Sequence, residues 1–186
     1  MKKKAPRYDN LLFYISVAAM VILIYSVSFI QFGSNLQNAI FLIGAFILFV
    51  SATASKQKVI QALEVIAVVG IVLALLKVYV IYSLITLLLL SLLIVGYLLK
   101  IEHYKKEPIG SIGSVGFILL AIGLAFNTGS YPLVTGFALA IGSILISIYA
   151  ATAFYLYKVR LQIVIAILDI AFAVSPVLLV LNTLGL

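Results

Sequence analysis

Long runs of apolar residues, separated by short polar segments, fill the chain from Leu11 onward. A helix needs about 20 apolar residues to cross the hydrocarbon core of a bilayer. The runs therefore predict an all-α fold, a polytopic transmembrane bundle of about seven spans that forms a single domain over residues 1–186. The predicted spans are Leu11–Ile30, Asn38–Ala54, two within Val59–Leu99, Ile112–Phe126, Leu133–Tyr155 and Leu161–Leu181.

The third apolar run, Val59–Leu99, is too long for one span. As a single helix its roughly 40 residues would measure about 60 Å, twice the thickness of the hydrocarbon core. We expect the chain to fold back near Lys77–Ser83, although no Gly or Pro marks a turn there. Lys77 and Tyr79 are the only polar signals for this break.

Basic residues gather in four short segments that lie two predicted spans apart. These segments hold Lys2, Lys3, Lys4 and Arg7, then Lys56 and Lys58, then Lys100, Lys105 and Lys106, then Lys158 and Arg160. Basic loops of membrane proteins face the cytoplasm. The spacing predicts a multi-pass cell-membrane protein with its N-terminus inside and its C-terminus outside, in which residues 1–10 are cytoplasmic. Lys77 is the exception.

The same N-terminal pattern, basic residues before an apolar run, also fits a signal peptide. The run after Arg7 is about 20 residues long, which is longer than the apolar core of a signal peptide. We therefore expect it to be retained as the first span.

Composition supports lipid as the solvent, because 66% of the residues are hydrophobic and 9% are charged. A soluble domain is about half apolar and about a quarter charged. The net charge of +7 lies in short loops, so we expect it to meet anionic lipid headgroups and not nucleic acid.

Chemistry-bearing residues are few. The chain has no cysteine and one histidine, His103, so we expect no metal site, no cofactor and no redox centre of its own. Nucleophile-elbow, phosphate-loop and H-E-x-x-H motifs are absent from the sequence. We expect the protein not to be an enzyme.

Short matches recur at an offset of about one hundred residues and suggest an internal repeat. Ile43–Gly44 matches Ile141–Gly142, Ala52–Ala54 matches Ala151–Ala153, and Lys58–Val59 matches Lys158–Val159. The repeat would relate residues 11–77 to residues 111–184, with the span at 78–99 as a linker, and both halves would run parallel. The linker span is leucine-rich and shows no stripe of small residues.

This three-plus-one-plus-three plan resembles the architecture of the SWEET and PnuC transporters. The resemblance implies a carrier built from two parallel three-helix halves. The chain departs from both families, since it has no proline-glutamine motif of the SWEET kind and no tryptophan to stack on a sugar or nicotinamide ring.

Small residues at helical spacing predict close helix packing, because lipid supplies no hydrophobic force between helices. The sixth span carries Gly136, Ala140, Ser143 and Ser147 on one face, and the fifth span carries Gly113, Gly116 and Gly123. The same residues would also suit the lining of a pathway, so both interpretations stay open.

Two carboxylates, Glu64 and Asp169, lie inside predicted spans. A centred acid costs about 2.5–3.5 kcal/mol on insertion scales, so it needs a partner or a proton. Asp169 shares a helix face with Gln162 and Pro176, and Glu64 shares one with Gln61. These five residues are the candidates for a proton or cation relay; the alternative is that the acids hydrogen-bond neighbours and fix packing.

Two functions stay open at this point. The first is a small carrier or channel for an ion or small solute, favoured by the paired acids and the repeat. The second is a non-catalytic structural subunit of a larger membrane complex, for example a respiratory one, favoured by the lack of a soluble domain or cofactor ligand. We expect either a homo-oligomer or a larger membrane complex as the assembled form.

Overall fold

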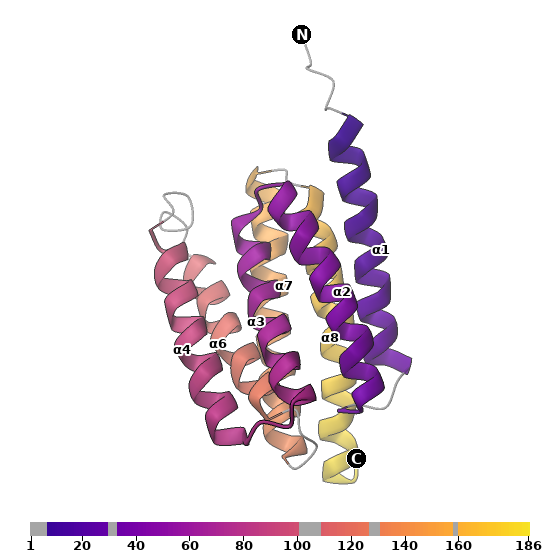
Figure 1. Ribbon diagram of the computed structural model, residues 1–186, viewed down its shortest axis with the longest axis vertical. Helices are drawn as coiled ribbons and strands as arrows, with labels where there is room; N and C mark the ends of the chain where they lie inside the picture. The colour runs from indigo at the N-terminus through magenta and orange to yellow at the C-terminus, as the bar shows by residue number, and fades with distance from the viewer. Residues whose placement is uncertain (1–6, 30–32, 101–108, 127–130, 158–159) are drawn as a thin grey trace.

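The computed structural model describes residues 7–29, 33–100, 109–126, 131–157 and 160–186. Within these ranges the protein is all-helical, as predicted, and has no strand. The seven helices are α1 (Arg7–Phe29), α2 (Asn35–Ala54), α3 (Lys58–Leu75), α4 (Val80–Leu98), α6 (Ile109–Ala125), α7 (Pro132–Tyr157) and α8 (Arg160–Leu184). They lie roughly side by side, and the chain reverses direction from each one to the next (Figure 1).

Five of the described helices are long and apolar enough to cross a membrane: α2, α3, α4, α7 and α8. The other two carry shorter described apolar stretches, Leu11–Ser26 in α1 and Gly110–Ala125 in α6. A helix satisfies its own backbone hydrogen bonds, which is why apolar helices are stable where no water is present. By length and composition, these helices are compatible with an integral membrane protein.

The third apolar run is divided into α3 and α4, and a non-glycine residue makes the break. Lys77 adopts a left-handed backbone with φ of 53°. The Val78 N–H donates to the Leu73 carbonyl at 3.0 Å, and the Lys77 N–H donates to the Ala74 carbonyl at 3.1 Å. This pair of bonds is the Schellman motif that ends many helices. The break lies between Leu75 and Val80, so it overlaps the start of the predicted segment Lys77–Ser83, and Ser83 lies inside α4.

The end of α2 has the same geometry at Lys56, whose φ is 56°. The Gln57 N–H donates to the Ala52 carbonyl at 2.9 Å, and the Lys56 N–H donates to the Thr53 carbonyl at 3.1 Å. Both motifs have a lysine at the position that glycine usually occupies. Glycine is usual there because it has no Cβ to clash in this conformation.

Six helices pack in a closed order around one core. Each of α1, α2, α3, α6, α7 and α8 packs on the next, and α8 packs back on α1. The fourth helix, α4, lies outside this ring and packs against α3 and α6, as Figure 1 shows at the edge of the bundle. The ring thus consists of α1–α3 and α6–α8, joined at the α3–α6 and α1–α8 contacts.

The face of α4 that packs on the bundle carries two buried serines, although no stripe of small residues was predicted for this span. Ser83 and Ser91 are buried together with Leu87 and Leu98, whereas Leu89 and Leu93 are exposed. Small hydroxyl residues let α4 approach its neighbours, and the exposed leucines suit contact with lipid.

Hydroxyl contacts join neighbouring helices. The Ser16 and Ser51 hydroxyls are 2.6 Å apart, and Ser51 also lies 3.0 Å from the Leu12 carbonyl, which connects α1 to α2. Ser147 donates to the Ala166 carbonyl at 2.8 Å, which connects α7 to α8. Such bonds between membrane helices contribute about 0.6 kcal/mol on average.

Candidate functional site

A cavity of about 40 Å³ lies between the two groups of three helices. One side is formed by residues of α1–α3: Leu23, Phe41, Leu63, Glu64, Ile66 and Ala67. The other side is formed by residues of α6–α8: Leu120, Leu124, Leu139, Leu168, Asp169 and Phe172. All six helices of the ring therefore contribute to the lining, and α4 does not.

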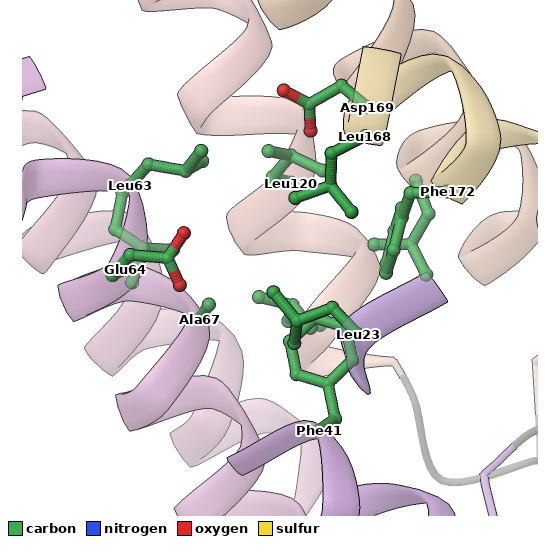
Figure 2. A pocket seen from close by; sticks show the side chains of 12 residues that line it. Leu23, Phe41, Leu63, Glu64, Ala67, Leu120, Leu168, Asp169 and Phe172 are labelled. Atoms are coloured by element: carbon green, nitrogen blue, oxygen red, sulfur yellow. The ribbon is translucent and has the colours of Figure 1, made fainter. Parts of the chain in front are cut away.

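Both intramembrane acids point into this cavity. Glu64 on α3 is 3% exposed and Asp169 on α8 is 6% exposed. Figure 2 shows their carboxyl groups directed into the same space from opposite sides. The Asp169 Oδ2 atom is buried and has no hydrogen-bond partner among the described residues. Since a buried polar group without a partner costs free energy, this oxygen is available to a ligand.

The positions of the two acids along their helices explain why they meet. Glu64 lies about 9 Å along the axis from Lys58, and Asp169 about 13.5 Å along the axis from Arg160. The two helices start near the same end of the bundle (Figure 1). The difference of about 4.5 Å is small enough for helix tilt and side-chain length to cover. Both acids therefore reach one cavity.

The rest of the lining is apolar and includes two aromatic rings. Phe41 and Phe172 lie edge to face, with ring centroids 5.5 Å apart. Neither ring was predicted from the sequence as a site residue. Phe172 is three residues after Asp169 and so shares its helix face, which is a signal that was present. Nothing in the local sequence marks Phe41, because it reaches the cavity from α2.

The other relay candidates lie outside the cavity. Gln162 is buried on α8 but is not part of the lining. Gln61 is half-buried and donates through Nε2 to the Thr53 hydroxyl at 2.8 Å. Pro176 is buried, and its carbonyl oxygen would lie 2.9 Å from a Cβ placed on Gly136. The structure thus brings Glu64 and Asp169 together but leaves these three at other positions.

The predicted packing residues lie at helix contacts. A Cβ on Gly116 would be 2.9 Å from the Ile146 side chain, one on Gly123 would be 2.5 Å from Leu139, and one on Gly136 would be 2.5 Å from Val180. The remaining members, Gly113, Ala140, Ser143 and Ser147, are buried. None of the seven lines the cavity.

The lining carries two acids and no basic residue, so the cavity is electrostatically suited to a cation or to protons. In the part of the chain that the structure describes, no group of three or more His, Asp or Glu residues could hold a metal ion. His103, Lys105, Lys106 and Lys158 lie outside the described residues, as do Lys2, Lys3 and Lys4.

The fold and the cavity define the chain as an all-helical protein with membrane-length helices and a buried acidic site. Comparisons with protein-family models, with curated proteins and with solved structures give no match. The function must therefore be argued from the site.

Proposed function

We propose that this protein is a seven-span carrier in the cell membrane that moves a small solute or ion through the cavity between α1–α3 and α6–α8. The observation that carries the proposal is the pair of acids, Glu64 and Asp169, that face one cavity from the two groups of helices. Buried ionisable residues inside membrane segments are costly and commonly mark substrate or proton pathways.

An internal repeat supports the proposal through equivalent packing contacts. A Cβ on Gly44 of α2 would touch Leu23 and lie 3.2 Å from the Ala19 carbonyl oxygen on α1. A Cβ on Gly142 of α7 would touch Leu120 and lie 3.2 Å from the Gly116 carbonyl oxygen on α6. Leu23 and Leu120 are separated in the sequence by the same number of residues as Ala19 and Gly116. The same contact therefore occurs in both halves.

The cavity lining follows the same equivalence. Leu23 pairs with Leu120, and Phe41 pairs with Leu139 at nearly the same offset. On α3 and α8, Leu63, Glu64 and Ala67 pair with Leu168, Asp169 and Phe172 at one shared offset. This offset is larger than the one between α2 and α7, mainly because α7 has 26 residues and α2 has 20. The cavity would then lie on the axis that relates two parallel halves, where many repeat-built transporters bind substrate.

The arrangement of charged ends supports an N-in, C-out orientation. The α2–α3 connection and the end of α4 lie at the same end of the bundle as the start of α1, and the α3–α4 turn lies at the opposite end (Figure 1). Lys56, Lys58 and Lys100 thus share one end, and Lys77 lies at the other. The positive-inside rule makes the first end cytoplasmic.

We prefer a carrier to a non-catalytic subunit because a purely structural subunit has no need for two facing acids in a cavity. No reacting group other than these carboxyls lines the site, so we also propose that the protein is not an enzyme. A fixed-stoichiometry partner in mild-detergent purification and mass spectrometry would favour the subunit.

The chain has no cysteine, so a single introduced thiol tests whether the cavity opens to water. In a carrier, Ala67→Cys in the lining should react with a small water-soluble methanethiosulfonate. Ala121→Cys is the matched control, since Ala121 is fully buried on α6 and does not line the cavity. Equal lack of reaction at both positions, in the purified protein and in membranes, would contradict the proposal.

A further inference from the structure

The chemistry of the cavity narrows the class of ligand. Among the described residues that line it, the Glu64 and Asp169 carboxyls are the only polar side chains, and the other ten are apolar. Two carboxylates that are both ionised in an apolar site would be uncompensated, which is prohibitively costly. The site must therefore hold either protons on the carboxyls or a cation between them.

An inorganic cation fits this lining poorly. Ca²⁺ binds about 6–8 oxygen atoms, and Mg²⁺ needs six in near-octahedral geometry. The lining side chains supply at most the oxygens of two carboxyls, with no hydroxyl, amide or imidazole beside them. A bare ion in this cavity would have leucine side chains instead of oxygen ligands on most sides.

An organic cation fits better, because its polar and apolar parts both find partners. Leucines surround the acids, and the Phe41–Phe172 pair forms part of the wall. Aromatic faces attract ammonium and guanidinium groups by about 0.5–2 kcal/mol. A cavity of about 40 Å³ holds a few water molecules by the same measure, so an ion of about four heavy atoms is the matching size.

Resting on the proposed carrier function, we infer that the cavity binds a small organic cation of the guanidinium or ammonium class and exchanges it for a proton. With both carboxyls protonated the empty site is neutral. When one cation enters, one proton leaves, and the site stays neutral. Asp169 is the exchanging group, because its Oδ2 atom has no partner and points into the cavity.

Among the side chains that the structure describes on α1, α2, α3, α6, α7 and α8, no other titratable group lines the cavity. Of the described lysines, Lys56, Lys58, Lys77 and Lys100 are all exposed near helix ends. Glu64 is thus the one titratable group that faces Asp169 across the site. It keeps its proton while Asp169 is ionised, which limits the charge to one carboxylate and one cation.

The test uses purified full-length protein in liposomes that contain a pH-sensitive dye and are loaded with guanidinium. Guanidinium stays charged at all working pH values, so it does not cross lipid as a neutral base. On dilution into guanidinium-free buffer at equal pH, its exit should draw protons in and acidify the lumen, at least tenfold faster than in protein-free liposomes. Liposomes loaded with Na⁺ or K⁺ should not acidify above that background.

Variants of the two acids identify the exchanging group. Asp169→Asn should reduce acidification to the background, Asp169→Glu should restore much of it, and Glu64→Gln should slow it less than Asp169→Asn does. Unchanged exchange in Asp169→Asn, or a greater loss in Glu64→Gln, would overturn the role of Asp169. The retained exchange of Asp169→Glu shows that a loss in Asp169→Asn does not come from misfolding.

Comparing liposomes loaded with guanidinium, Na⁺ or K⁺ tests this inference separately from the proposed function. Acidification driven by Na⁺ or K⁺ as fast as by guanidinium would overturn the organic-cation class while leaving the carrier in place. No acidification with any ion, in protein whose Ala67→Cys variant reacts from water, would refute the exchange alone. No acidification together with an unreactive Ala67→Cys would refute the carrier as well.

Discussion

Gly116 on α6 and Gly142 on α7 bring two helix backbones into direct contact. A Cβ on Gly116 would lie 3.1 Å from the Gly142 carbonyl oxygen, and a Cβ on Gly142 would lie 3.2 Å from the Gly116 carbonyl oxygen and 2.9 Å from the Leu120 backbone nitrogen. Backbone atoms cannot rotate away as a side chain can. We therefore expect Gly142→Ala to push α6 and α7 apart and to destabilise the protein by about 1–3 kcal/mol.

The matched control for this change is Gly96→Ala on α4. A Cβ on Gly96 meets no atom within 4 Å, so alanine gains helix propensity of up to about 1 kcal/mol without a clash. Thermal unfolding in detergent should show a lower midpoint for Gly142→Ala and an equal or higher midpoint for Gly96→Ala. A rise in both would mean that α6 and α7 do not approach as described.

Ser143 and Ser147 lie one turn apart on α7 and should respond oppositely to loss of the hydroxyl. Ser147 donates to the Ala166 carbonyl, whereas the buried Ser143 Oγ has no partner among the described residues. Ser147→Ala should cost about 0.6–1.7 kcal/mol. Ser143→Ala should be neutral or stabilising, because it removes a buried polar atom that is not hydrogen-bonded. Thermal unfolding of the two single variants gives the comparison, and an equal loss in both would contradict it.

Lys77→Gly should stabilise the α3–α4 turn. A left-handed backbone costs a non-glycine residue about 1 kcal/mol, and glycine removes that cost. Lys100→Gly is the control, since Lys100 also follows a helix end but its φ is not positive. We expect a higher unfolding midpoint for Lys77→Gly and no gain for Lys100→Gly. A lower midpoint for Lys77→Gly would show that the lysine side chain matters more than its backbone.

The proposed orientation predicts which introduced thiols can be labelled from outside the cell. Lys58, the first residue of α3, and Tyr79, which lies between α3 and α4, are both exposed, and α3 separates them. A membrane-impermeant thiol reagent applied to intact cells should label Tyr79→Cys and should label Lys58→Cys only after permeabilisation. The reverse pattern would invert the topology, and labelling of both from outside would remove one span from the proposed count.

The helices could be predicted from the sequence because each apolar run must satisfy its own backbone in lipid. Helix ends were harder, since they depend on local bonds. We expected the second span to start at Asn38, but α2 begins at Asn35 because the Ser34 hydroxyl accepts the Gln37 N–H at 3.1 Å. The length of the third apolar run predicted a turn near Lys77, but not its left-handed backbone, because lysine is not a residue that normally signals a left-handed helix cap.

The site could be predicted only in part, because its members come from different helices. Glu64 and Asp169 stand out in the sequence as acids within apolar runs. We grouped three further residues with the acids because they share their helix faces: Gln61, Gln162 and Pro176. One helix face extends over several turns, and only part of it borders the cavity. Leu23 and Phe41 join the lining through packing of α1 and α2 on the other helices, which no local pattern contains.

The place of α4 makes the two junctions of the ring unequal. The halves meet at α3–α6 and at α1–α8, but α4 packs across the first junction only. The α3–α6 junction is therefore covered by an extra helix, whereas no other described helix packs across the α1–α8 junction. In the proposed carrier, the halves would separate more easily at α1–α8, and a partly apolar ligand would enter the cavity from that side.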